Sequence, residues 1–207
     1  MAAVGLLALQ GAFREHKRAL EELDAFVVEV RRPEQLDGVD ALVIPGGEST
    51  AISKLMDEWR MREPLVEAGK RGLPMLGTCA GAILLSRETS DARVKPLGLL
   101  DMRVDRNAFG RQVDSFETDL SVSCLGARRF PGVFIRAPGI TEIGDSVEVL
   151  STINLRGRRE AVAVKQGNVI ATSFHPELTD DLRLHKYFLD LVADYCERRA
   201  APTAAAG

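Results

Sequence analysis

This chain of 207 residues has few cysteines and no long apolar run, and each absence excludes a class of protein. Its three cysteines, Cys79, Cys124 and Cys196, are odd in number and form no closely spaced pair, which argues against a disulfide framework and a zinc knuckle. The longest apolar runs, such as Val4–Leu9, are much shorter than the roughly 20 residues that cross a bilayer. No signal peptide pattern opens the chain. We therefore expect a cytoplasmic protein with free thiols.

An excess of charge of one sign is also absent. The 27 Lys and Arg against 30 Asp and Glu give a net charge of −3, which provides no global field to collect nucleic acid or anionic membrane. Small substrates or protein partners are favoured instead. The length and the 45% hydrophobic content suit one compact domain, which we expect over residues 1–199, followed by a disordered tail of small residues at 200–207.

The first hundred residues alternate short apolar runs with amphipathic stretches, a pattern typical of βαβ units and a parallel sheet. Expected strands are Val4–Leu9, Phe26–Val30, Ala41–Ile44 and Leu73–Leu76; expected helices are Phe13–Leu23, one capped by Ser49 or Thr50, Arg62–Lys70 and Ala80–Ser86. We predict an α/β fold with three layers: a mostly parallel central sheet, helices on both faces, and antiparallel β additions.

Beyond residue 100 the pattern changes to short β-rich segments, which predicts those antiparallel additions. The segments are Gln112–Val122, Val133–Arg136, Val147–Ile153, Ala161–Lys165 and Val169–Ser173, and an amphipathic helix over Leu182–Arg198 follows them. The basic cluster at 156–159 is most simply a solvated hairpin turn.

A sharp turn around Cys79 is the first candidate for chemistry. An apolar strand, the sequence Gly-Thr-Cys-Ala-Gly and a helical pattern follow one another in the order of a nucleophile elbow. Gly77 and Gly81 would relieve crowding around a strained residue, and the N–H of Ala80 is placed to donate to a developing oxyanion. Taken alone, the motif fits a buried structural cysteine equally well.

The sequence Phe-His-Pro-Glu at 174–177 provides a base and a group to orient it. Pro176 favours extended backbone at His175, and alternate residues of an extended chain point the same way, so His175 and Glu177 should share one face. A carboxylate beside the imidazole fixes its tautomer and stabilises its cation. An ordinary loop histidine is the alternative, and Cys79 weighs against it.

The glycine pair of Pro45-Gly46-Gly47-Glu48 ends a predicted strand before a helix. Gly47 can bring its N–H close to a substrate carbonyl as a second oxyanion donor, and Glu48 would lie at the rim of the pocket. By itself the segment could be a simple turn.

The other two histidines, His16 and His185, fall in predicted helices, where a surface or interface role is expected. The three histidines are too dispersed to indicate a metal cluster, so we expect no metal.

Together these motifs resemble the class I (triad) glutamine amidotransferases, and among them most closely the glutaminase subunits of pyridoxal 5′-phosphate synthases. The similar blocks are Ala8–His16, Pro45–Thr50, Gly77–Gly81, Arg106–Gln112, Phe134–Pro138 and Phe174–Leu178. The triad is shared across the larger family, whereas the blocks around Gln10 and Arg106 are more specific. The resemblance covers nearly the whole chain and implies a flavodoxin-like fold.

The resemblance also implies roles for individual residues. Cys79 would be the nucleophile, His175 the general base and acid, and Glu177 the group that orients His175. Gly47 and Ala80 would be the oxyanion donors. The positions that match glutamine contacts are Gly47, Glu48, Ser49, Arg106, Ile135 and Arg136, and Gln10 matches a position linked to activation by a partner. No cofactor is implied.

The implied activity is the hydrolysis of L-glutamine to L-glutamate and ammonia. The implied partner is a separate (β/α)₈ synthase subunit that builds pyridoxal 5′-phosphate from a pentose phosphate and a triose phosphate, in a hetero-oligomeric complex. Three alternatives stand beside this reading: the glutaminase of another amidotransferase such as imidazole glycerol phosphate synthase, a cysteine-dependent peptidase, and a non-catalytic binding subunit of the same fold.

Overall fold

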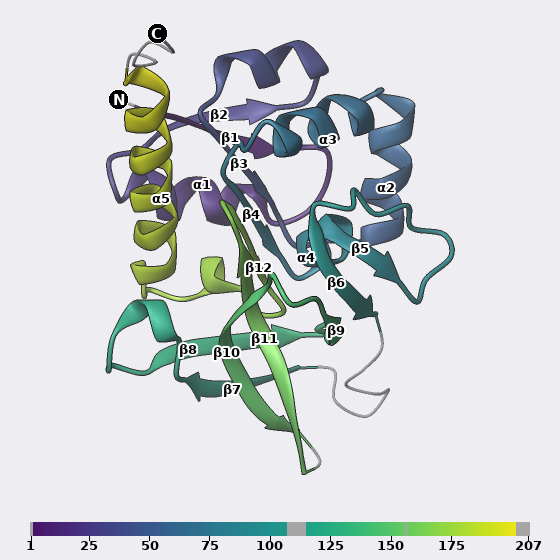
Figure 1. Cartoon of the computed structure of the whole chain (residues 1–207), viewed down its shortest axis with the longest axis vertical. Helices are drawn as coiled ribbons and strands as arrows, with labels where there is room; N and C mark the ends of the chain where they lie inside the picture. The colour runs from purple at the N-terminus through teal and green to yellow at the C-terminus, as the bar shows by residue number, and fades with distance from the viewer. Residues whose placement is uncertain (1, 107–114, 156, 202–207) are drawn as a thin grey trace, which may run out of the picture.

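A mixed β-sheet runs through the centre of the computed structural model, which describes residues 2–106, 115–155 and 157–201 (Figure 1). In spatial order its strands are β2 (Phe26–Val30), β1 (Ala3–Leu7), β3 (Ala41–Ile44), β4 (Met75–Thr78), β12 (Val169–Thr172), β11 (Arg158–Gln166), β9 (Gly139–Ile143), β6 (Leu100–Asp105) and β5 (Ser86–Thr89), and β10 (Glu148–Leu155) also pairs with β11. The first five are parallel. Beyond β12 the pairing is antiparallel until β6 and β5, which are parallel to each other.

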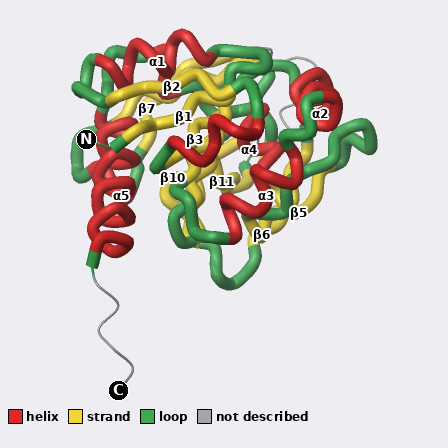
Figure 2. Tube along the Cα trace, turned by 90° about the horizontal axis from the view of Figure 1, so that it is seen from above, coloured by secondary structure: helices red, strands yellow, loops and turns green. Residues whose placement is uncertain are grey.

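Apolar side chains alternate between the two faces of the strands and bury both. In β3, Leu42 and Ile44 belong to one core cluster, whereas Ala41 and Val43 belong to the other. The first cluster is covered by α2 (Ser49–Glu58), α3 (Arg62–Lys70) and α4 (Ala80–Leu85), and the second by α1 (Phe13–Glu21) and α5 (Arg183–Ala200). Figure 2 shows β1 and β3 between α1 and α4. The predicted α/β class with helices on both faces is confirmed.

A separate two-stranded sheet of β7 (Ser115–Leu120) and β8 (Phe130–Ile135) lies beside the end of β12. Phe130 and Phe134 of β8 pack against Phe174, with ring centroids 5.8 Å and 5.7 Å away. The backbone N–H of the next residue, His175, donates to the carbonyl of Val133 at 2.8 Å. This sheet therefore fixes the segment that carries the predicted base.

The structure differs from the sequence-based expectations in three local features. The side chain of Glu48, rather than Ser49 or Thr50, caps α2 by accepting from the N–H groups of Thr50 and Ala51. Strand β4 continues to Thr78, directly before Cys79, because it pairs with both β3 and β12. The strands β5, β6 and β9 were not expected at all.

Other predictions are confirmed or lie outside the described residues. Leu155 pairs with Arg158, as the predicted hairpin requires, although residue 156 itself is not described. Residues 112–114 of the expected strand and 202–207 of the expected tail also lie outside. In the described residues, no helix is long and apolar enough to span a membrane. Three short 3₁₀ helices, η1 (Pro33–Gly38), η2 (Ser123–Leu125) and η3 (Pro176–Leu178), complete the described elements.

Candidate active site

Cys79 lies on a strained turn between β4 and α4. Its backbone has φ +49° and ψ −102°, a conformation that non-glycine residues rarely adopt. A Cβ at Gly81 would lie 2.0 Å from the carbonyl oxygen of Ile44, and one at Gly77 would lie 2.5 Å from Leu85. Both glycines are therefore required by close packing, as predicted, and the turn presents Cys79 at the carboxyl edge of the sheet.

His175 and Glu177 form a hydrogen-bonded pair in a dry environment. Nδ1 of His175 lies 2.8 Å from Oε1 of Glu177, and each residue is only 7% exposed. The predicted pairing is observed, but its expected cause is wrong. Pro176 opens the 3₁₀ helix η3, so a helical turn rather than extended backbone brings Glu177 back toward the ring.

Burial and the neighbouring side chains set the protonation of this pair. Burial by itself would lower the pKa of His175, but its contacts with Cys79 and Glu177 outweigh burial and raise that pKa to about 10. Burial would likewise raise the pKa of Glu177, but the facing His16 and His175 lower it on balance. At neutral pH the pair is thus an imidazolium and a carboxylate. The imidazolium lies beside the sulfur of Cys79, which is one of the contacts that raise the pKa of His175.

The Gly46–Gly47 segment leaves room for the imidazole. A Cβ at Gly46 would lie 2.5 Å from Cε1 of His175 and 3.4 Å from Cβ of Cys79, so only glycine fits between them. The carbonyl of Gly46 accepts from the N–H of Ala12 at 2.9 Å. Because N–H and C=O point in opposite directions across a trans peptide, the N–H of Gly47 points away from Ala12.

Gln10, in the segment that follows β1, contacts the same Gly46–Gly47 segment. Its Oε1 accepts from the N–H of Glu48 at 2.8 Å. The same atom would be 2.5 Å from a Cβ at Gly47. Gln10 therefore fixes the backbone that carries one of the two predicted oxyanion donors. The other predicted donor, Ala80, is the first residue of α4, where backbone N–H groups have no partner within the helix.

Glu48 and Arg106 are brought together although 58 residues separate them. The Arg106 guanidinium contacts Oε1 of Glu48 at 2.5 Å and Oδ2 of Asp91 at 2.6 Å. Burial would raise the pKa of Glu48, but hydrogen bonds from Thr50 and Ala51 and the charge of Arg106 lower it on balance. Glu48 is therefore an anion, and its side chain is 44% exposed.

The remaining predicted contact residues differ in accessibility. The carbonyl oxygen of Ile135 lies 3.9 Å from Sγ of Cys79, and this residue is 38% exposed. Arg136 is exposed and has φ +43°. Ser49 is buried, and its hydroxyl has no hydrogen-bond partner in the described structure. Residues 107–112 of the Arg106 block lie outside the described residues.

The expectation for His16 and His185 is wrong. Both are fully buried, and Nδ1 of His16 lies 3.0 Å from Nε2 of His185. Nε2 of His16 lies 3.0 Å from Oγ1 of Thr78 and 3.4 Å from Oε2 of Glu177. These contacts join α1, α5, β4 and η3 behind the candidate triad.

Sequence reasoning missed His16, Thr78 and Asp91 as parts of the site. The signal for His16 was its place at the end of the Ala8–His16 block, and that for Thr78 was its position next to Cys79. Asp91 lies in an irregular segment and carries no such signal.

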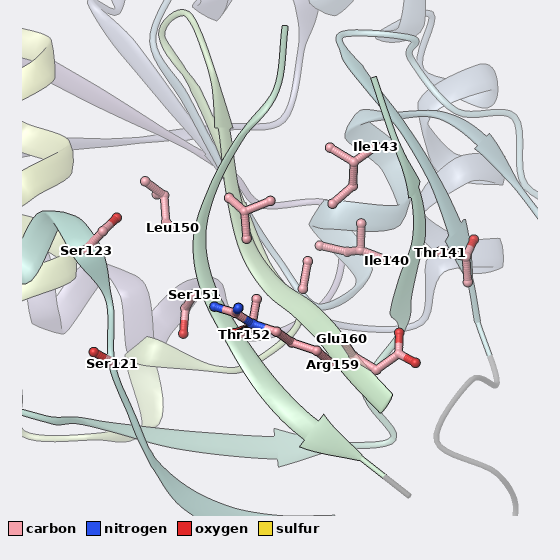
Figure 3. Close-up of a pocket in the computed structure, with 12 residues that line it drawn as sticks. Ser121, Ser123, Ile140, Thr141, Ile143, Leu150, Ser151, Thr152, Arg159 and Glu160 are labelled. Atoms are coloured by element: carbon pink, nitrogen blue, oxygen red, sulfur yellow. Dashed lines mark hydrogen bonds between the residues drawn. The ribbon is translucent and has the colours of Figure 1, made fainter. Parts of the chain in front are cut away.

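A cavity of about 740 Å³ lies elsewhere, between β9, β10 and β11 (Figure 3). Its lining includes Ile140, Ser151, Arg159 and Glu160 and none of the predicted site residues. Within the described ranges, no cluster of His, Cys, Asp or Glu could hold a metal ion.

The close packing at Gly81 gives a test of the turn. Gly81→Ala should destabilise the protein by about 1–3 kcal/mol, because the clash with a backbone oxygen outweighs the roughly 1 kcal/mol that alanine gains in a helix. Gly38→Ala is the matched control, since a Cβ there meets nothing within 4 Å. Urea unfolding measures both. Equal stability of the two variants would contradict the described turn.

Comparisons with known proteins agree with this geometry. The model of the SNO glutamine amidotransferase family matches residues 6–194. The chain is 56% identical over 187 residues to "Pyridoxal 5′-phosphate synthase subunit PdxT" of Pelotomaculum thermopropionicum, covering 90% of this chain and 93% of that protein. It is 52% identical over 192 residues to the protein of the same name from Desulforudis audaxviator, covering 93% and 100%.

A solved structure described as a glutamine amidotransferase superposes with a TM-score of 0.84 at 51% identity, covering 92% of this chain and 98% of that one. The chain therefore belongs to the SNO glutamine amidotransferase family.

Proposed function

We propose that this protein hydrolyses L-glutamine to L-glutamate and ammonia, and supplies the ammonia to a synthase subunit that makes pyridoxal 5′-phosphate. The observation that carries the proposal is the buried His175–Glu177 pair in contact with Cys79 on its strained turn. Relatives named as pyridoxal 5′-phosphate synthase subunits match over about nine tenths of the chain and support the pathway.

In the proposed reaction, the thiolate of Cys79 attacks the side-chain amide carbon of glutamine and forms a tetrahedral oxyanion. The N–H groups of Gly47 and Ala80 are the proposed donors to that oxygen. His175 then protonates the amide nitrogen as the C–N bond breaks, which releases ammonia and leaves a thioester. Water, deprotonated by the now neutral His175, cleaves the thioester to glutamate and restores the thiolate.

The opposite end of the substrate needs two charged partners. Free glutamine carries an ammonium and a carboxylate, and Glu48 and Arg106, two oppositely charged side chains, lie next to each other. We propose that Glu48 holds the ammonium and that Arg106 or Arg136 holds the carboxylate. Ser49 and Ile135 are the remaining proposed contacts.

We further propose that the partner is the (β/α)₈ synthase subunit and that the complex works in the cytoplasm without nucleic acid or membrane. The free cysteines fit a reducing compartment.

Cys79→Ala should reduce ammonia release at least about a thousandfold, because the reaction loses its nucleophile. Cys124→Ala and Cys196→Ala, which change the other two cysteines, should keep nearly the wild-type rate. The assay measures ammonia from glutamine in the presence of the synthase subunit. Substantial turnover by Cys79→Ala would remove Cys79 from the mechanism.

The synthase subunit should stimulate the reaction. We expect ammonia release to rise about tenfold or more when the synthase subunit is added, which is a typical size for the coupling between two sites of a protein. Gln10→Leu should reduce this rise, because it removes the acceptor for the N–H of Glu48. Gln35→Leu, a change at an exposed glutamine in η1, is the control. Identical turnover with and without the subunit argues against the proposal that Gln10 links this site to its partner.

The three cysteines should differ in their reaction with iodoacetamide. Burial raises the pKa of both the Cys124 and the Cys196 thiols, so these stay protonated at neutral pH, whereas Cys79 is the proposed nucleophile and lies beside the protonated ring of His175. Cys79 should therefore be labelled preferentially at pH 7. The preference should shrink as pH approaches 10, where His175 loses its proton and the other thiols ionise.

Peptide mass spectrometry measures the labelling, and His175→Asn should abolish the preference at pH 7. Faster labelling of Cys124 than of Cys79 at that pH would be incompatible with a Cys79–His175 ion pair.

A further inference from the structure

His16 and His185 are buried and take no part in the proposed reaction, but His16 lies next to the Glu177 carboxylate and His185 lies next to His16. Glu177 uses Oε1 to accept from His175, and its Oε2 is buried and has no hydrogen-bond partner in the described structure. Nε2 of His16 faces that second oxygen at 3.4 Å. A carboxylate so deeply buried needs a favourable dipole beside it to stay ionised, and the ring of His16 is placed to supply one.

Counting hydrogen-bond donors assigns the tautomer of His16. Burial lowers the pKa of His16, and it lowers that of His185 to about 3, so both rings are neutral and each has one N–H. If His16 carries its proton on Nε2, that N–H donates to Oγ1 of Thr78 at 3.0 Å, and Oε2 of Glu177 lies 3.4 Å from the same nitrogen. Nδ1 then accepts from Nε2–H of His185. Nδ1 of His185, which has no partner in the described structure, is then a bare nitrogen.

The opposite tautomer is unfavourable on two counts. A proton on Nδ1 of His16 would require His185 to accept at Nε2 and hence to carry its own proton on Nδ1, as a buried donor without a partner. The lone pair on Nε2 of His16 would also face the negative oxygen of Glu177. His185 therefore fixes His16 with its N–H toward the site.

We propose that His16 is a positioning residue of the glutaminase, held by His185 so that its Nε2–H keeps the Glu177 carboxylate ionised and aimed at His175. This inference rests on the proposed function. His16 also contacts Thr78, which precedes Cys79 and whose hydroxyl accepts from the N–H of Gly46 at 3.0 Å. One ring thereby contacts both the strand that presents the nucleophile and the acid that orients the base.

The charged and titratable groups around Glu177 are few. His16 faces it from α1, His175 from the preceding residue, and His185 acts from α5 at longer range. Glu15 acts on His16, and Cys79 acts on His175. Loss of the His16 dipole should therefore raise the pKa of Glu177, because burial is then less compensated.

The kinetic test compares His16→Leu, which removes the N–H, with His16→Gln, which keeps an N–H donor that cannot titrate. With the synthase subunit present, His16→Leu should lower kcat about 10- to 100-fold, as misplacement of a catalytic group does, with KM nearly unchanged. The acid limb of its kcat profile should move to higher pH. His16→Gln should recover most of kcat and the wild-type limb.

Leu20→Ala is the control for stability. Leu20 is buried in α1, the helix that also carries His16, but it belongs to an apolar core cluster that does not include His16. It should lower the melting temperature without moving the acid limb. A His16→Leu enzyme with wild-type kcat and acid limb overturns the inference while leaving the proposed function intact. A wild type that releases no ammonia with the synthase subunit overturns both.

A spectroscopic test does not depend on the folding of any variant. The chain has only three histidines, so their ring nitrogens can be resolved by ¹⁵N NMR of the wild-type protein. We expect His16 and His185 to be neutral Nε2–H tautomers from about pH 6 to 8, near the ordinary histidine pKa of about 6.5. A His16 that is protonated, or that carries its proton on Nδ1, overturns the inference.

Discussion

The 2.8 Å hydrogen bond between His175 and the buried carboxylate of Glu177 is the interaction on which the site depends. A carboxylate taken out of water is unfavourable unless cations or dipoles surround it, so the protein must provide them. It does so from two sides, with His175 at one oxygen and His16 at the other. The resulting imidazolium lies beside the sulfur of Cys79, the proposed nucleophile. Burial, charge and nucleophilicity are thus parts of one arrangement.

The parallel half of the sheet explains how distant residues meet. Strands β1, β3, β4 and β12 run in the same direction, so the segments after them gather at one edge. Gln10 follows β1, Gly46 follows β3, Cys79 follows β4 and His175 follows β12. The antiparallel half contributes differently. Strand β8 of the small sheet holds the backbone of His175, and its phenylalanines pack against Phe174.

Sequence reasoning predicted those parts of the fold and site that depend on local pattern. Alternating apolar runs gave the parallel strands, and the glycines around Cys79 gave the turn. His16 and His185 were misjudged because their burial depends on contacts across 169 residues, and helical position alone does not reveal it. The edge strand β5, Ser-Arg-Glu-Thr, has little apolar character to signal a strand. The Glu48 cap was missed because a serine and a threonine beside it are more usual caps.

The central claim is that Cys79 is the nucleophile of a glutaminase. The most direct measurement is peptide mass spectrometry after incubating the protein and the synthase subunit with the diazoketone analogue of glutamine, which alkylates a nucleophile at the position of the amide. The account predicts one adduct, on the peptide that contains Cys79, and its suppression by excess L-glutamine. An adduct on Cys124, Cys196 or another residue, or no adduct while ammonia is still released from glutamine, would contradict it.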